Sequence, residues 1–271
     1  MNIYISIDME GISGINSIYQ TDPNHKRYEE GLFYMRRELE AILKILKNYN
    51  IKKIVVNDAH WNMDNLSIKD FEEYQIELIS GSPKMLSMME GINSDFKYAL
   101  FIGYHSSANS IRGFIDHTYS SYSIAEIKIN GRKVNEAYIN GLIASYYNVP
   151  VGLISGDDRL IEECRDLFKE TEFVITKYSL SRSAVKLIGF NEVYKRYSTA
   201  IENMLKKDIK PLDIPKEFEI EITFRKTEMV DIIEILPIVQ RIDGNKILFR
   251  ENDFIRAFRY IRVMINLARS A

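Results

Sequence analysis

The order of β-forming and helix-forming segments constrains the fold of this chain more than any other feature of its sequence. Residues 3–8 are rich in β-forming side chains. From Arg27 to about Asn48, apolar residues recur at helical spacing, which predicts an amphipathic helix. Residues 51–58 return to a β-forming pattern. Two strands joined by a helix form a βαβ unit with parallel strands, so the sequence predicts an α/β fold.

The rest of the chain continues this alternation. Residues 98–103 are almost continuously apolar, which is typical of a central strand buried on both faces. Further strands are expected at 76–79, 122–130, 151–155 and 173–176, and helices at 135–147, 157–168 and 191–207.

Two prolines, Pro211 and Pro215, indicate an extended connection late in the chain. After it we expect a strand at 218–224, a short helix, a strand at 246–249 and a terminal helix from Asp253. We therefore predict two domains. Residues 1–210 form an open, mostly parallel sheet flanked by helices, and residues 211–271 form a smaller α+β domain.

Composition narrows the functions open to the chain. Its 36 Lys and Arg against 38 Asp and Glu give a net charge of −2, without the basic excess typical of nucleic-acid binders. One cysteine excludes a disulfide framework and a zinc site built from thiolates. There is no run of roughly 18 apolar residues to span a membrane, and residues 1–11 lack the pattern of a signal peptide. We expect a cytoplasmic protein without nucleic-acid or membrane partners.

Polar side chains follow three of the expected strands where each strand ends. The carboxyl ends of parallel strands meet in one crevice, where open sheets bind ligands, so we expect these side chains to converge. Asp8 and Glu10 lie two residues apart on extended backbone, so both carboxylates face the same way. The other side chains at these strand ends are Asn57, Asp58, His60 and His105.

Two carboxylates with two or three imidazoles and no thiolate are typical of a catalytic zinc site rather than a structural one. Five or six candidate ligands suffice for two metals about 3.5–4 Å apart. Each residue alone also has an ordinary interpretation: Asp8 and Glu10 as exposed capping acids, and His60, beside Trp61, as a packed imidazole. Their shared position at strand ends favours the metal site. His117 is also compatible with a surface turn, and His25 with a solvated one.

Several ordered motifs resemble the zinc-dependent D-aminopeptidase family, peptidase family M55. They are Ile-Asp-Met-Glu-Gly-Ile-Ser-Gly at 7–14, Val-Asn-Asp-Ala-His at 56–60, Gly-Tyr-His at 103–105 and Ser-Arg-Ser-Ala-Val-Lys at 181–186. Further similar segments occupy 78–81, 146–151 and 156–159, so the resemblance covers nearly the whole chain.

The resemblance implies a metal-binding catalytic domain with two zinc ions per subunit. It assigns Asp8 as the bridging ligand, Glu10 and His105 to one metal, and His60 and Glu136 to the other. From the sequence alone, Glu136 is equally an acid that stabilises a helix N-terminus. The resemblance also matches His117 to the family's catalytic histidine and implies a homodecamer that encloses its active sites.

The residues and the resemblance together lead us to expect metal-assisted hydrolysis of the N-terminal peptide bond of short peptides, with His117 transferring a proton. That the peptides contain D-amino acids, of the D-Ala type, is implied by the resemblance. Two alternatives stay open. The same two-metal centre would serve an L-aminopeptidase or another amide or ester hydrolase, because pocket walls decide chirality. The fold would also serve a non-enzymatic binding protein, which would hold no stoichiometric metal.

Three further features have competing interpretations. Polar residues at 106–110 fit an ordinary loop better than a set of hydrogen-bond donors lining a pocket. Arg182 and Lys186, four apart on a possible helix, either bind a carboxylate of the substrate or a neighbouring subunit, or form a solvated face. Cys164 is expected to have no chemical role, or to be a small buried apolar residue.

Overall fold

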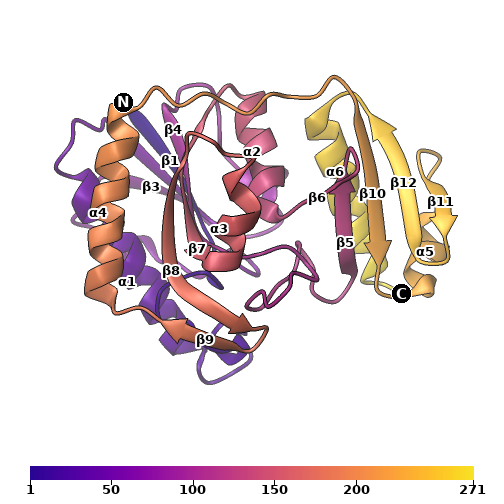
Figure 1. Cartoon of the computed structure of the whole chain (residues 1–271), viewed down its shortest axis with the longest axis horizontal. Helices are drawn as coiled ribbons and strands as arrows, with labels where there is room; N and C mark the ends of the chain where they lie inside the picture. The colour runs from indigo at the N-terminus through magenta and orange to yellow at the C-terminus, as the bar shows by residue number, and fades with distance from the viewer.

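A seven-stranded sheet occupies the N-terminal part of the chain in the computed structural model, which describes all 271 residues (Figure 1). Its strand order is β3 (Ile76–Ile79), β2 (Lys53–Asp58), β1 (Asn2–Ile7), β4 (Tyr98–Tyr104), β7 (Val151–Asp157), β8 (Glu172–Ser181) and β9 (Ala184–Leu187). Every neighbouring pair is parallel except β8 and β9. The predicted open, mostly parallel sheet is therefore confirmed.

Helices cover both faces of this sheet (Figure 1). α1 (Tyr28–Leu46) and α4 (Phe190–Lys206) pack on one face, and α2 (Glu136–Tyr146) and α3 (Asp158–Arg165) pack on the other. Successive residues of β4 point to opposite faces, so Leu100 joins the core beneath α1 while Phe101 joins the core beneath α2. This explains the continuous apolar run in β4, which is buried along its full length.

A second, antiparallel sheet has the order β11 (Gln240–Asp243), β12 (Lys246–Glu251), β10 (Phe218–Phe224), β5 (Ile124–Ile129) and β6 (Arg132–Lys133). The short helix α5 (Thr227–Ile233) and the terminal helix α6 (Phe254–Ala268) accompany it. Strands from 124–133 thus lie beside strands from the last sixty residues. The division into domains at 210 stays a prediction, and the second sheet combines segments from both sides of it.

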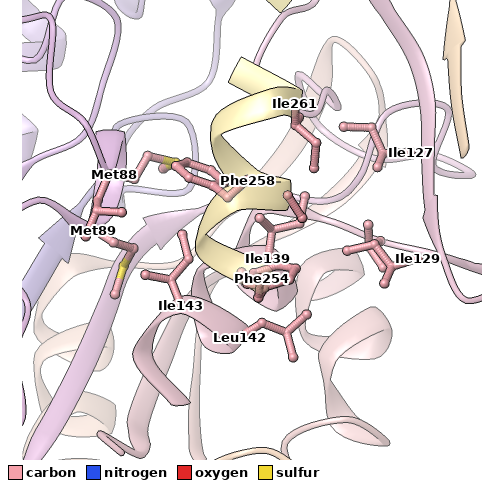
Figure 2. Close-up of a cluster of buried hydrophobic side chains, with 14 of the residues drawn as sticks. Met88, Met89, Ile127, Ile129, Ile139, Leu142, Ile143, Phe254, Phe258 and Ile261 are labelled. Carbon is pink, nitrogen blue, oxygen red and sulfur yellow. The ribbon is translucent and has the colours of Figure 1, made fainter. Parts of the chain in front are cut away.

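An apolar cluster connects the two sheets through α2 and α6 (Figure 2). Phe258 of α6 lies among Ile127 of β5, Ile143 of α2 and Met88 of a 3₁₀ turn. Burying side chains of this size contributes roughly 1.5–3 kcal/mol each. Because α6 is held in place by this core, its side chains form a fixed wall beside the carboxyl ends of the parallel strands.

The predicted helix around Arg182 and Lys186 is wrong. β8 extends to Ser181, turns at residues 182–183 and returns as β9, where Lys186 lies opposite Tyr178. A spacing of four residues is compatible with one helical turn. In the structure, however, the backbone N–H and C=O groups of this segment form their hydrogen bonds with β8. Short 3₁₀ helices also occur at Ile18–Gln20, Ile68–Phe71 and Ser87–Met89. None of the helices is both long enough and apolar enough to cross a membrane.

Candidate metal centre

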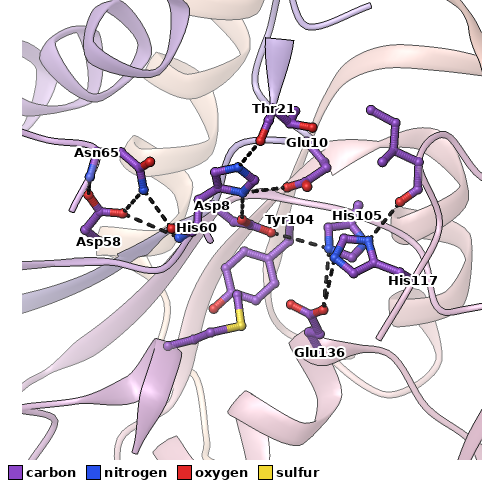
Figure 3. A network of polar contacts seen from close by, with 12 residues as sticks. Asp8, Glu10, Thr21, Asp58, His60, Asn65, Tyr104, His105, His117 and Glu136 are labelled. Carbon is purple, nitrogen blue, oxygen red and sulfur yellow. Dashed lines mark hydrogen bonds and ion pairs between the residues drawn. The ribbon is translucent and has the colours of Figure 1, made fainter. Parts of the chain in front are cut away.

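All six residues expected from the sequence and the resemblance meet at the carboxyl ends of the central strands (Figure 3). Asp8 and Glu10 follow β1, His60 follows β2, and His105 follows β4. The two others are Glu136, the first residue of α2, and His117, in the long connection from β4 to β5. Five of the six are buried, while the His117 side chain keeps 17% of its surface exposed.

Asp8 lies between two imidazoles and presents one carboxylate oxygen to each. Its Oδ1 is 3.2 Å from Nδ1 of His60, and its Oδ2 is 3.4 Å from Nε2 of His105. Glu10 approaches the same nitrogen of His60, with Oε2 at 3.1 Å. Asp8, Glu10 and His60 therefore form one group whose ligand atoms lie close enough to share an ion.

A second group consists of His105, His117 and Glu136. Oε1 of Glu136 is 3.6 Å from Nε2 of His105 and 3.9 Å from Nε2 of His117. The structure groups these side chains differently from the assignment implied by the resemblance, because His60 lies with Glu10 and Glu136 lies with His105.

The backbone determines which nitrogen of each imidazole faces the centre. Nε2 of His60 lies 2.8 Å from the carbonyl of Thr21, Nδ1 of His105 lies 3.0 Å from that of Ser106, and Nδ1 of His117 lies 2.9 Å from that of Ile115. A carbonyl only accepts hydrogen bonds, so these nitrogens carry the proton. The opposite nitrogen of each ring is left to bind an ion or a proton, as in metal-binding histidines.

The buried groups fit a pair of divalent cations. Oε2 of Glu10 and Nε2 of His105 are both buried without a hydrogen-bond partner. Burial and the neighbouring charge of Glu10 raise the pKa of Asp8 to about 7. Burial alone would lower the pKa of His105, but the charges of Glu136 and Asp8 raise it to about 9. Metal ions would compensate the buried carboxylates in place of these protons.

Close backbone packing holds the Asp8–Glu10 segment against β4. The amide of Gly11 donates to the carbonyl of Gly103 at 2.8 Å. A Cβ atom on Gly11 would come within 1.9 Å of the carbonyl oxygen of Tyr104, so only glycine fits there. This contact holds the segment that follows β1 beside β4, where Asp8 lies next to His105.

Comparison with known proteins agrees with this geometry. A family model described as D-aminopeptidase (Peptidase_M55) matches residues 1–263. The chain belongs to this family. The D-aminopeptidase of Bacillus subtilis (strain 168) is 32% identical over 271 residues, which are 99% of this chain and 98% of the relative. A solved structure, "Zn-dependent D-aminopeptidase DppA from Bacillus subtilis, a self-compartmentalizing protease", matches with a TM-score of 0.93 at 31% identity, covering 100% of this chain and 99% of that chain.

The centre of this family member opens into a cavity of about 500 Å³. Trp61, which is 55% exposed, lines it together with Lys84, Tyr119 and Arg182. Sequence reasoning did not identify Lys84 or Tyr119, because each lies in a loop without a periodic pattern. Three residues of α6 also reach the cavity, and their spacing of four and three along a helix was a signal in the sequence: Arg262, Asn266 and Arg269.

Other candidates from the sequence lie outside the centre. Asp58 accepts hydrogen bonds from the amides of Asn65 and Leu66 and so holds the loop that follows His60. None of the four polar residues at 106–110 lines the cavity; Ser107, for example, bonds to Glu163. His25 stacks on Tyr19, and Cys164 is buried in α3.

Proposed function

We propose that the chain is a zinc-dependent aminopeptidase that removes an N-terminal D-amino acid, such as D-Ala, from short peptides. The observation that carries this proposal is the convergence of three buried carboxylates and three imidazoles in which every imidazole turns toward a carboxylate the nitrogen that is not bonded to a backbone carbonyl. The chain belongs to the D-aminopeptidase family and resembles a zinc-dependent member in structure. Both findings support the choice of metal and substrate.

The geometry supports two metal positions that share Asp8. Glu10 and His60 would complete one, beside Oδ1 of Asp8. His105 and Glu136 would complete the other, beside Oδ2. Zinc in these positions supplies Lewis acidity that polarises the scissile carbonyl and activates water.

We assign to His117 the transfer of a proton between the reacting groups. It lines the cavity, and the bond from Nδ1 to the carbonyl of Ile115 leaves Nε2 free beside Glu136. Burial and the adjacent charge of His105 lower the pKa of His117, which favours the neutral form of the imidazole. A neutral imidazole accepts a proton during attack and can return it to the leaving amine.

We also propose that the protein assembles as a homo-oligomer, a homodecamer in keeping with the family. Support comes from the likeness to a protease described as self-compartmentalizing. Native mass spectrometry would check the number of subunits. A monomer at micromolar concentration would contradict the proposal.

Metal analysis combined with stereospecific kinetics tests the function. We expect close to two zinc ions per chain and hydrolysis of D-Ala-D-Ala much faster than L-Ala-L-Ala, with activity lost on chelation and restored by zinc. Preference for the L-peptide would favour the alternative of an L-aminopeptidase. Absence of both bound metal and hydrolysis of either peptide would favour a binding protein.

A further inference from the structure

One wall of the cavity carries two arginines that form no ion pair with an acidic side chain. Arg262, Asn266 and Arg269 occupy one stripe of α6 at spacings of four and three residues, and all three line the cavity. Neither arginine has a carboxylate oxygen within 4.0 Å. The side chains that form the metal centre line the same cavity.

Arg262 is connected to the metal centre through Tyr119. Its guanidinium lies over the ring of Tyr119, 5.2 Å from the ring centroid. The amide of Tyr119 in turn donates a hydrogen bond of 2.6 Å to Oε1 of Glu136. A single residue thus separates the guanidinium from a proposed zinc ligand.

Tyr119 gives Arg262 a defined position. Its hydroxyl donates to Oδ1 of Asn140 at 2.9 Å, and its ring packs against Phe258 of the apolar cluster with a centroid distance of 5.9 Å. A cation held over a fixed aromatic ring loses less conformational freedom when it binds an anion.

The cations of the cavity that lie outside α6 are already engaged. Arg182 pairs with Asp116 at 3.0 Å. The Lys84 ammonium donates to Oδ1 of Asn57 and to the carbonyl of Asp58, each at 2.6 Å. Arg262 is half-buried and has no such partner, so its guanidinium is available to bind an anion in the cavity.

We infer that Arg262, with Asn266 beside it, binds the C-terminal carboxylate of the peptide substrate. This inference rests on the proposed function and specifies its substrate class as short peptides with a free α-carboxylate. An alanine peptide has only one anionic group, and a guanidinium binds a carboxylate through two parallel hydrogen bonds. The scissile bond would then lie between the carboxylate–imidazole centre and the α6 wall.

A matched pair of substrates tests this assignment. D-Ala-D-Ala and D-alanyl-D-alaninamide differ in the charge at the C-terminus and little else. We expect the wild-type protein to hydrolyse the acid with a kcat/KM at least about tenfold higher. In Arg262→Gln, kcat/KM for the acid should fall about ten- to a hundredfold, mainly through KM, while the amide is hardly affected.

Two further variants separate charge recognition from structural support. Arg262→Lys keeps the charge and should recover part of the preference for the acid. Arg259→Gln changes an exposed arginine of the same helix that does not line the cavity, and should keep the wild-type ratio. Zinc content and the thermal unfolding midpoint are measured for every variant.

Three other outcomes would contradict the inference. An equal loss on both substrates in Arg262→Gln would show that Arg262 acts through Tyr119 and Glu136, and would overturn the inference. Equal turnover of acid and amide by the wild-type protein would overturn it too, while leaving the proposed function intact. Hydrolysis of neither peptide by zinc-loaded protein would reject the proposed function and this inference with it.

Discussion

The imidazoles of His105 and His117 are stacked, with their centroids 4.0 Å apart and their planes 10° from parallel. Two protonated rings at this distance would repel each other. Charge on His105 therefore disfavours charge on His117 and, together with burial, lowers the pKa of His117. The pair combines a proposed metal ligand with a neutral imidazole that faces the cavity.

Removing the His117 imidazole should slow turnover strongly without releasing zinc from the centre. We expect His117→Ala to lower kcat about 10²- to 10⁴-fold, because proton transfer by a side chain contributes factors of that size. Zinc content, measured by elemental analysis, should match the wild-type protein. Full metal content with full turnover would reject the catalytic assignment, and loss of one zinc would make His117 a ligand instead.

Asp8 should be needed for the binding of both zinc ions, whereas Glu136 should be needed for the binding of one. Because Asp8 directs its two oxygens to different imidazoles, we expect Asp8→Asn to lose most of both zinc ions and Glu136→Gln to retain about one. Equilibrium dialysis with elemental analysis measures both. Asp8→Asn that still holds one zinc tightly would contradict the shared position.

Lys177 should stabilise the backbone that carries the proposed ligand Glu10. It is fully buried, and its ammonium donates to the carbonyls of Glu10 at 2.7 Å and Ile15 at 2.9 Å. Lys177→Met leaves both carbonyls without their donor, so we expect weaker zinc binding and a free energy of unfolding lower by about 2 kcal/mol. A competition titration with a zinc chelator and urea denaturation measure these. The control is Lys186→Met on β9, which is exposed, and unchanged zinc affinity in Lys177→Met would contradict the prediction.

Glu38 should make stability depend on pH. Burial raises its pKa to about 7, although Tyr197 and the amide of Ser13 donate hydrogen bonds to it. The folded state therefore binds more protons than the unfolded state between about pH 4.5 and 7, and stability contributed by this group decreases as pH rises through that window. Relative to Glu38→Gln, the wild-type protein should lose about 1–3 kcal/mol across it.

Urea denaturation of both zinc-free proteins at several pH values measures this difference. Only the change with pH is compared, because the glutamine also alters the bonds to Tyr197 and Ser13. A difference between the two proteins that stays constant from pH 4.5 to 7 would contradict the raised pKa.

Four of the proposed ligands were predictable from local pattern, and two residues were not. Asp8, Glu10, His60 and His105 follow recognisable strands, and parallel strands bring their carboxyl ends together. Glu136 begins a helix and His117 lies in a long loop, so no periodicity marks either residue; only the family resemblance pointed to them.

The amino-acid sequence by itself determined the alternation of strands and helices, the parallel sheet and the edge at which polar side chains gather, because these depend on short-range periodicity. The tertiary structure decided that β5 joins the C-terminal strands, that residues 182–187 form a hairpin, and that Arg262 faces the cavity with no acidic partner. Those features depend on contacts between segments far apart in the chain or on competition between backbone pairings, and spacing along the sequence does not specify either one.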